Sequence, residues 1–269
     1  MNLIESIILG IIQGLTEFLP VSSSGHLELG KVILGVQFEE NAVLYSAVVH
    51  AATALSTIVV YYKDILTIIQ DLFKFKWNDS TKFVVMVLVS MIPAGLVYAF
   101  LGDYLDELFS GKIMLVGFML IITAGLLYAS SRLVSKPGDL TIGKAFTVGL
   151  AQAFALLPGV SRSGSTISTA LMLGINREAA ARFSFLMVIP VILGGTLLEL
   201  KDYFDAESAG QIVEVGADAL IAGFLAAFIS GLVACTWMIK LVKNAKLDYF
   251  AIYCVVVGFI AITYQLAFG

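Results

Sequence analysis

Six uninterrupted runs of uncharged, mostly apolar residues dominate the chain: 42–62, 83–102, 113–131, 183–198, 219–239 and 249–269. Each run has 16 to 21 residues, close to the roughly 20 that a helix needs to cross about 30 Å of hydrocarbon. The pattern therefore predicts six membrane-spanning helices. Pro93 and Pro190 fall inside two of them and predict a kink in each, because proline removes a backbone hydrogen bond from a helix.

Four further apolar pieces are shorter and are interrupted by polar residues: 6–16, 18–27, 145–161 and 163–176. The first pair breaks at Glu17 and Pro20, and the second pair breaks within 158–162. Short apolar helices joined by a polar break are typical of re-entrant hairpins, which enter and leave the membrane on one face. The pattern predicts two such hairpins, at about 3–36 and 141–176, each with its polar tip near the middle of the membrane.

The two hairpins resemble each other in sequence. An alignment that places Gly10 on Gly149 also pairs Gln13 with Gln152, Ser22 with Ser161, Ser23 with Arg162, Ser24 with Ser163, and Gly25 with Gly164. The chain then divides into two repeats, 1–137 and 138–269, each a hairpin followed by three spans, within one integral membrane domain. A coincidence of small and apolar residues is the alternative explanation, and the paired polar breaks argue against it.

The distribution of lysine and arginine predicts how the chain is oriented in the membrane. Twelve lysines and arginines lie in segments on one predicted face of the membrane, and only three lie on the other: Lys31, Lys112 and Lys201. Lysine and arginine are enriched in cytoplasmic loops, so the basic face is predicted to be cytoplasmic, with both termini outside. Each repeat has an odd number of crossings, so the repeats are inverted and the hairpin tips can meet near the centre.

Composition supports the membrane assignment and excludes other classes. Only 13% of the residues are charged and the mean hydropathy is +0.96, whereas a soluble domain carries about 25% charged residues. The net charge of −4 offers no basic surface for nucleic acid, so no such partner is expected. Cys235 and Cys254 lie in apolar runs and are expected to be packing residues, not a disulfide or a metal pair.

The polar tips contain groups that suit an anion. If new helices begin near Ser22 and Ser161, their backbone N–H groups and positive dipole ends point into a shared cavity. Serines at these positions can donate to an anion, although simple helix capping is the alternative. Arg162 adds a forked cation that matches phosphate oxygens. The alternative for Arg162 is a buried ion pair with Glu17, which would itself mark a functional site.

Glu17 and His26 supply acid–base or nucleophilic capacity. His26 lies four residues after Ser22, so the two side chains share a helical face. Glu17 could ligate a divalent cation, orient His26 or activate water, and Gln13, one turn earlier, lines the same face. His50, by contrast, is expected to be a hydrogen-bonded packing residue.

An arginine, helix N-termini, a carboxylate and a histidine in one site predict phosphoryl chemistry on an amphiphilic substrate, because such chemistry depends on charge neutralisation and positioning. The residues leave a second function open. An inverted-repeat transporter or flippase for an anionic lipid phosphate would need the same binding groups.

The motifs around these residues resemble a known family. Residues 13–26 resemble the (Glu/Gln)-x-x-x-Glu and PVSS-x-GH signature of the bacterial undecaprenyl-pyrophosphate phosphatases, also called the bacitracin-resistance family. Residues 158–166 are similar to its PG-x-SRS-x-x-T motif, and residues 183–186, followed by Pro190, are similar to its third recurrent stretch. The resemblance covers essentially the whole chain, with the motifs in the right order and spacing.

This resemblance implies an integral-membrane phosphatase that converts undecaprenyl pyrophosphate to undecaprenyl phosphate and inorganic phosphate. Such an enzyme recycles the lipid carrier for peptidoglycan synthesis and confers bacitracin resistance. It also implies a bacterial cytoplasmic membrane, bilayer lipids around the chain, an active site open to the outer face, and a divalent cation such as Mg²⁺ or Ca²⁺.

By motif position, the resemblance implies a catalytic core of Glu17, His26 and Arg162, with Glu17 as a metal ligand. The implied substrate-binding residues are Gln13, Ser22, Ser23, Ser24, Ser161, Ser163 and Thr166. Gln13 stands where many members have glutamate, so this chain offers one carboxylate in place of two. The nucleophile, which is His26, Ser23 or water, and the oligomeric state, monomer or homodimer, do not follow from the sequence.

Overall fold

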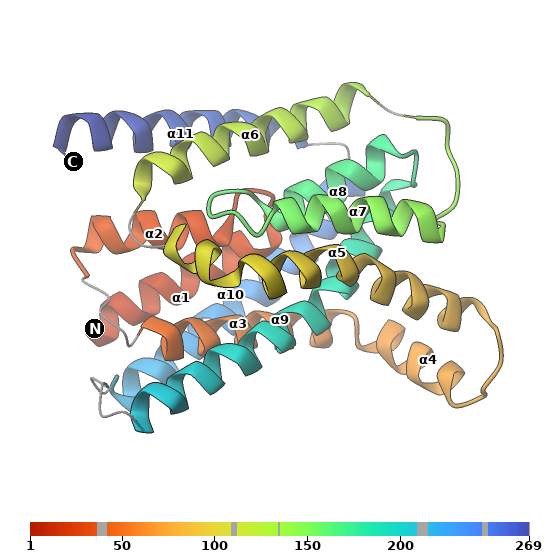
Figure 1. The fold of residues 1–269 in the computed structure, drawn as a ribbon, viewed down its shortest axis with the longest axis horizontal. Coiled ribbons are helices and arrows are strands. Elements are labelled where there is room, and N and C mark those ends of the chain that lie inside the picture. The colour runs from red at the N-terminus through yellow and green to blue at the C-terminus, as the bar shows by residue number, and fades with distance from the viewer. Residues whose placement is uncertain (37–41, 109–111, 134, 209–214, 244–246, 269) are drawn as a thin grey trace.

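The computed structural model describes residues 1–36, 42–108, 112–133, 135–208, 215–243 and 247–268 (Figure 1). These residues are helical apart from connecting loops and one isolated parallel β-bridge between Gly138 and Ile175. The helices, in chain order, are α1 (Leu3–Phe18), α2 (Ser23–Leu34), α3 (Ala42–Val60), α4 (Tyr62–Leu72), α5 (Asp79–Leu108), α6 (Ile113–Arg132), α7 (Ile142–Phe154), α8 (Arg162–Met172), α9 (Arg177–Ser208), α10 (Ala217–Lys243) and α11 (Leu247–Phe268).

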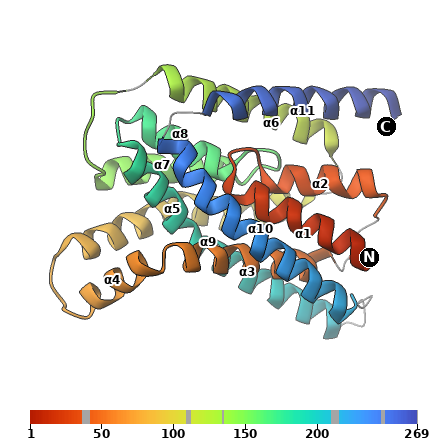
Figure 2. The same ribbon diagram turned by 180° about the vertical axis from the view of Figure 1, so that it is seen from behind.

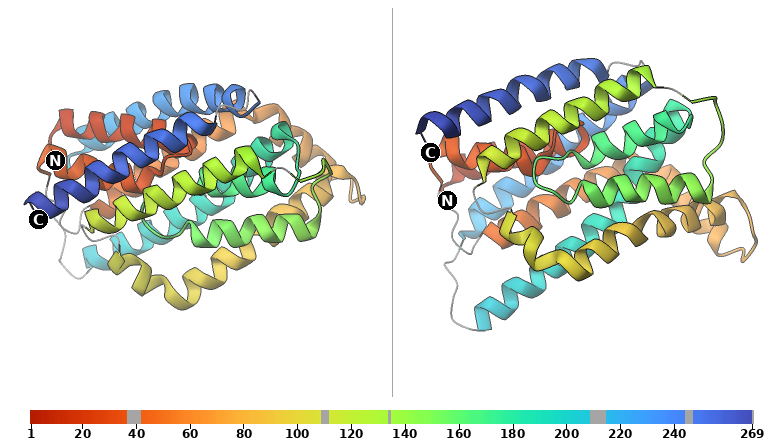
Figure 3. Two further views of the ribbon diagram at one scale, coloured as in Figure 1. Left: turned by 90° about the horizontal axis from the view of Figure 1, so that it is seen from above. Right: turned by 45° about the horizontal axis from the view of Figure 1, so that its top comes forward.

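Six of the described helices are long and apolar enough to cross a membrane, namely α3, α5, α6, α9, α10 and α11. They confirm the six predicted spans and make the chain a multi-pass membrane protein. Helices α5 and α9 run beyond the predicted 83–102 and 183–198, because charged side chains near a helix end can reach water while the backbone stays helical. Pro93 and Pro190 lie inside continuous helices, and α5 changes direction along its length (Figure 3).

Helix α4 was not predicted, since most of its residues lie between the first two apolar runs, in a segment that contains charged residues. It is amphipathic and too short to span, and it lies at the end of the molecule far from both termini (Figure 1). Its apolar side chains are partly exposed, with Leu66 at 51% and Ile69 at 43%. A helix of this kind is suited to the membrane–water interface.

Each pair of short helices packs closely on a long helix at a glycine, and the two glycines are aligned with each other in the sequence. Helix α1 packs along α10, and α7 packs along α5. A Cβ on Gly10 would lie 3.1 Å from the Cα of Gly223, and a Cβ on Gly149 would lie 2.9 Å from the Cα of Ser90. Small residues let helix backbones approach this closely. Helices α6 and α11 form a further pair along one side of the bundle (Figure 2).

The loops of the two hairpins meet inside the bundle (Figures 1 and 3). Ser163 Oγ donates to the Leu19 carbonyl at 3.1 Å, and a Cβ on Gly25 would lie 3.2 Å from the Cα of Gly159. Gly159 has φ +92 and packs on α6, where a Cβ would come within 2.7 Å of the Val116 carbonyl oxygen. The fold therefore brings the two polar tips of the sequence together.

Candidate active site

The first tip is the turn between α1 and α2. Ser22 is the N-cap of α2, and its Oγ accepts a hydrogen bond from the Gly25 N–H at 3.2 Å. Ser22 has φ 72 and ψ 102, a backbone conformation that costs a non-glycine residue of order 1–3 kcal/mol. The strained turn aims the Ser22 carbonyl at His26, whose backbone N–H donates to it at 3.1 Å.

The second tip starts α8 directly at Arg162. Ser161 caps the helix, since its Oγ accepts from the Gly164 N–H at 3.0 Å. The first backbone bond of the helix runs from the Ser165 N–H to the Ser161 carbonyl at 2.8 Å, so the N–H groups of Arg162 and Ser163 precede the helical ladder. Two N–H groups and the positive end of the helix dipole are thereby available to an anion.

Thr123 of α6 forms hydrogen bonds with the backbone of this second tip. Sequence reasoning did not identify it. Its Oγ1 accepts from the Ser161 N–H at 3.0 Å and lies 3.3 Å from the Gly159 carbonyl. Thr123 belongs to the apolar run 113–131, where an isolated hydroxyl gives no signal in hydropathy.

The central contact of the site joins the two tips. Arg162 Nη2 donates to Glu17 Oε1 at 2.5 Å, with side-chain exposures of 17% and 6%. The other carboxylate oxygen, Oε2, accepts from Gln13 Nε2 at 2.9 Å and from Ser23 Oγ at 2.7 Å. The ion pair considered from the sequence is therefore present, and it lies within a network that holds the carboxylate by three donors.

Two buried polar atoms beside this network have no hydrogen-bond partner within the described residues. They are Arg162 Nη1, a donor, and Gln13 Oε1, an acceptor. Buried polar groups are usually hydrogen-bonded, and exceptions concentrate where a ligand, ion or water completes the site. A free donor and a free acceptor on either side of Glu17 suit an anion together with a cation or water.

His26 is oriented by contacts other than Glu17. Its Nδ1 lies 2.8 Å from the Ser22 carbonyl, and its Nε2 lies 2.8 Å from the hydroxyl of Tyr253 on α11. The two rings stack with centroids 5.6 Å apart and an interplanar angle of 13°. A carbonyl can only accept, so Nδ1 carries the proton and Nε2 accepts from the tyrosine. Tyr253 was missed by sequence reasoning because it lies within the last apolar run.

Several predicted substrate-binding hydroxyls are engaged with the protein. Thr166 Oγ1 donates to the Arg162 carbonyl at 2.9 Å and lies 2.6 Å from Ser184 Oγ. Ser24 Oγ lies 3.3 Å from Ser22 Oγ, and Ser163 Oγ bonds across the tips to hairpin one, as described above. These contacts lie within and between the tips, and Ser23 is the serine whose hydroxyl bonds to Glu17 among the described residues.

A second polar cluster lies between α3 and α9. Ser46 Oγ is 3.1 Å from His50 Nδ1 and donates to Glu199 Oε1 at 3.1 Å. The expectation that His50 is hydrogen-bonded is thus confirmed. Cys235 and Cys254 are both buried in the bundle and free, as side chains that pack against neighbouring helices would be.

The donors present set limits on a metal site. Among the residues that the structure describes, no three His, Cys, Asp or Glu side chains come close enough to hold a metal ion. Glu17 and Gln13 Oε1 can supply two oxygens, and Mg²⁺ commonly binds one or two protein oxygens together with substrate phosphates. The site therefore fits a cation that shares the phosphates of its substrate, and it does not fit one held by protein side chains alone.

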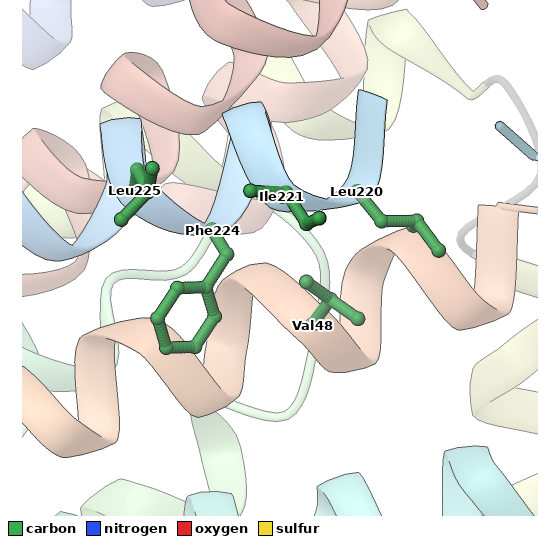
Figure 4. Close-up of a pocket in the computed structure, with 5 residues that line it drawn as sticks. All are labelled: Val48, Leu220, Ile221, Phe224 and Leu225. Atoms are coloured by element: carbon green, nitrogen blue, oxygen red, sulfur yellow. The ribbon is translucent and has the colours of Figure 1, made fainter. Parts of the chain in front are cut away.

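An apolar groove between α3 and α10 lies apart from this chemistry (Figure 4). Its lining residues are Val48, Leu220, Ile221, Phe224 and Leu225. Ile221 is 61% exposed, so the groove belongs to the apolar outer surface of the bundle and suits lipid chains.

Comparison with known proteins agrees with the motifs. The family model described as bacitracin resistance protein BacA matches residues 6–260. An undecaprenyl-diphosphatase of Christiangramia forsetii is 50% identical over 270 residues, covering 99% of this chain and 100% of the relative. An undecaprenyl-diphosphatase of Methanobrevibacter smithii is 38% identical over 276 residues, covering 97% of this chain and 96% of the relative. This chain belongs to the bacitracin resistance protein BacA family.

Proposed function

We propose that this protein is an undecaprenyl-diphosphatase, which hydrolyses undecaprenyl pyrophosphate to undecaprenyl phosphate and inorganic phosphate. The observation that carries the proposal is the Arg162–Glu17 contact, in which an arginine with an unbonded Nη1 lies at a helix N-terminus beside a buried carboxylate. Relatives that are half identical over their full length carry this activity in their names. In the cell, the activity would recycle the lipid carrier for peptidoglycan synthesis and confer bacitracin resistance.

The diphosphate head binds between the two hairpin tips. Its oxygens take the place of the Glu17 carboxylate on Arg162 and accept from the N–H groups at the start of α8. This exchange releases Glu17 from its ion pair. The same groups then stabilise the charge that develops on the transferring phosphoryl group.

Ser23 is the nucleophile that the geometry favours, because its Oγ already donates to Glu17 Oε2 at 2.7 Å. As the Ser23 Oγ–P bond forms, Glu17 takes the hydroxyl proton. The bond from the terminal phosphorus to the bridging oxygen breaks, with its electron pair leaving on undecaprenyl phosphate. Water then attacks phospho-Ser23 and releases inorganic phosphate. Phosphoserine trapped by a denaturing quench at neutral pH would support this assignment, and phosphohistidine trapped in the same way would transfer the role to His26.

Glu17 and Gln13 Oε1 would hold a divalent cation, Mg²⁺ or Ca²⁺, which would supply neutralisation of the diphosphate charge. The unbonded Gln13 Oε1 supports this placement.

The proposed setting is the bacterial cytoplasmic membrane, with both termini outside and the site open to the outer face. The segments 63–82, 131–133, 135–144, 175–182 and 240–243 contain most of the basic residues and lie at the end of the bundle away from the termini (Figure 1). Residue 134 and residues 244–246 of these basic segments lie outside the described residues.

Inverted repeats at 1–137 and 138–269, each with a re-entrant hairpin, are part of the proposal. The support is a matched pattern of packing, in which α1 lies on α10 of the other repeat and α7 lies on α5 of the first. Each hairpin is thus held by a long helix of the opposite half.

Purified protein in detergent micelles, given undecaprenyl pyrophosphate and Mg²⁺, tests the function directly. Release of inorganic phosphate without a membrane gradient is the expected result. No release in micelles, combined with movement of the intact lipid in proteoliposomes, would overturn the proposal in favour of a transporter or flippase.

A further inference from the structure

The hydroxyl of Tyr253 occupies the one ring nitrogen of His26 that could act on a substrate. Nδ1 is committed to the Ser22 carbonyl at 2.8 Å, so its proton cannot leave without breaking that bond. Nε2 holds the free lone pair, and Tyr253 Oη lies 2.8 Å from it. The resting protein therefore carries a histidine with a fixed tautomer and a covered reactive nitrogen.

The stacked arrangement adds a second restraint on His26. The parallel rings, at 13° and 5.6 Å between centroids, limit rotation of the imidazole about its side-chain bonds. Tyr253 is anchored on α11, which packs along α6. Helix α2, which carries His26, lies beneath that pair in Figure 1. Tyr253 thus links a long outer helix to the tip of the first hairpin.

The contact also lies on the lipid side of the bundle. Tyr253 is 44% exposed, and its neighbours Ile252 and Val256 on α11 are 63% and 50% exposed. Such apolar side chains suit contact with the prenyl chain of a lipid substrate whose diphosphate head is bound at the hairpin tips.

We propose that Tyr253 is a positioning residue for the phosphatase reaction: it holds His26 in the Nδ1–H tautomer and, when the lipid diphosphate binds, yields the Nε2 lone pair to the attacking water, whose O–H donates to it. The exchange replaces one hydrogen bond on Nε2 by another, and no covalent bond changes. This inference rests on the proposed function for its catalytic meaning, whereas the resting contact exists independently of substrate.

The resting contact is tested by NMR on protein labelled with ¹⁵N-histidine. The chain has only two histidines, so a His50→Gln background leaves His26 as the single labelled residue. The expected spectrum has a protonated Nδ1 and an unprotonated, hydrogen-bonded Nε2. Tyr253→Phe, which keeps the ring and removes the hydroxyl, should shift the Nε2 resonance and leave Nδ1 in place. An unchanged Nε2 resonance would overturn the proposal.

The positioning role is tested by kinetics in micelles. Tyr253→Phe should lower kcat about tenfold with KM unchanged or lower, since a positioned acid–base group contributes roughly 10² to 10⁴ to rate and the variant loses only its orientation. Tyr249→Phe is the matched control, because Tyr249 lies one turn earlier on α11 and is 69% exposed. Its kcat and KM should equal those of the wild type.

The outcomes separate the two proposals. A fully active Tyr253→Phe variant beside an active wild type would overturn the role of Tyr253 alone. An inactive wild type would overturn the proposed function and, with it, the catalytic role of Tyr253. The NMR result would still report whether the resting contact exists.

Discussion

Arg162 at the start of α8 and Glu17 at the end of α1 lie 145 positions apart in the sequence and 2.5 Å apart in the structure, from Nη2 to Oε1. The contact ties the two hairpin tips together. On the proposed mechanism an incoming phosphate replaces this contact, because both phosphate and carboxylate match the guanidinium fork. The same pair would then contribute to stability and to substrate binding.

Arg162→Ala should reduce phosphate release by a factor of roughly 10² to 10³ or more, the range expected when a group that stabilises developing charge is removed. Arg182→Ala is the matched control. Arg182 Nε also donates to a carboxylate, Asp64 Oδ1, at 2.6 Å, but both side chains are 38% exposed and lie outside the site. Near-normal activity of Arg162→Ala, with intact membrane insertion, would remove this arginine from the mechanism.

Glu17→Gln should lower both activity and stability. The substitution leaves the charge of Arg162 buried without its counter-ion, and breaking such a pair costs about 3–5 kcal/mol. The double variant Glu17→Gln/Arg162→Gln should recover much of the unfolding temperature while remaining inactive. Thermal unfolding in detergent measures this, and equal melting temperatures for the single and double variants would contradict it.

Gly159→Ala should destabilise the second tip. Its φ of +92 is unfavourable for alanine, and the added Cβ would lie 2.7 Å from the Val116 carbonyl oxygen. Gly125→Ala in α6 is the control, because nothing lies within 4 Å of its Cβ position and alanine is favoured over glycine in helices by about 1 kcal/mol. In thermal unfolding, the melting temperature of Gly159→Ala should be lower than that of the wild type, and that of Gly125→Ala should not be lower.

Gln13→Glu should increase the affinity of the site for a divalent cation. A carboxylate in place of the unbonded Gln13 Oε1 adds a charged oxygen ligand beside Glu17, so the Mg²⁺ concentration for half-maximal activity should fall several-fold. Chelation by EDTA should abolish the activity of both the wild type and Gln13→Glu, and added Mg²⁺ should restore it. Activity of the wild type that persists in excess EDTA would contradict a cation in the site.

Asp71, at the turn from α4 to α5, predicts a small pH dependence of stability. Hydrogen bonds from Lys74 and Ser80 hold the pKa of the Asp71 carboxyl below its usual range. The folded state then binds this proton more weakly than the unfolded state, so the stabilisation is complete above the ordinary aspartate range near pH 4 and is lost as the pH falls through the lower, folded value.

Asp71→Asn should therefore lower the melting temperature at pH 7, and its difference from the wild type should shrink as the pH drops below 4. Asp79→Asn serves as control, since the Asp79 side chain is 99% exposed. A difference between Asp71→Asn and wild type that stays constant from pH 7 to pH 3 would refute the linkage.

Hydropathy alone was sufficient for the six spans and for the breaks between the short helices α1 and α2 and between α7 and α8, because crossing a bilayer imposes a length and an apolar composition that are local properties of the chain. The motifs were sufficient to single out Glu17, His26 and Arg162 as candidate site residues, since polar and charged groups in such sequence are costly and therefore conspicuous, and the structure brings Glu17 and Arg162 together. Helix α4 escaped detection because its amphipathic, partly charged sequence resembles a loop when only span length is considered.

The residues that contact the site side chains from other helices could be identified only from the tertiary structure. Thr123 and Tyr253 lie within apolar runs, and a helix that is apolar on all sides contains no local information about which face meets the site. Their contacts depend on how α6 and α11 pack against the hairpin tips. Thr123 and Ser161 are separated by 38 positions in the sequence, and His26 and Tyr253 by 227. Long-range contacts of this kind depend on how helices rotate and pack, so no local pattern of hydrophobic and polar residues could specify them.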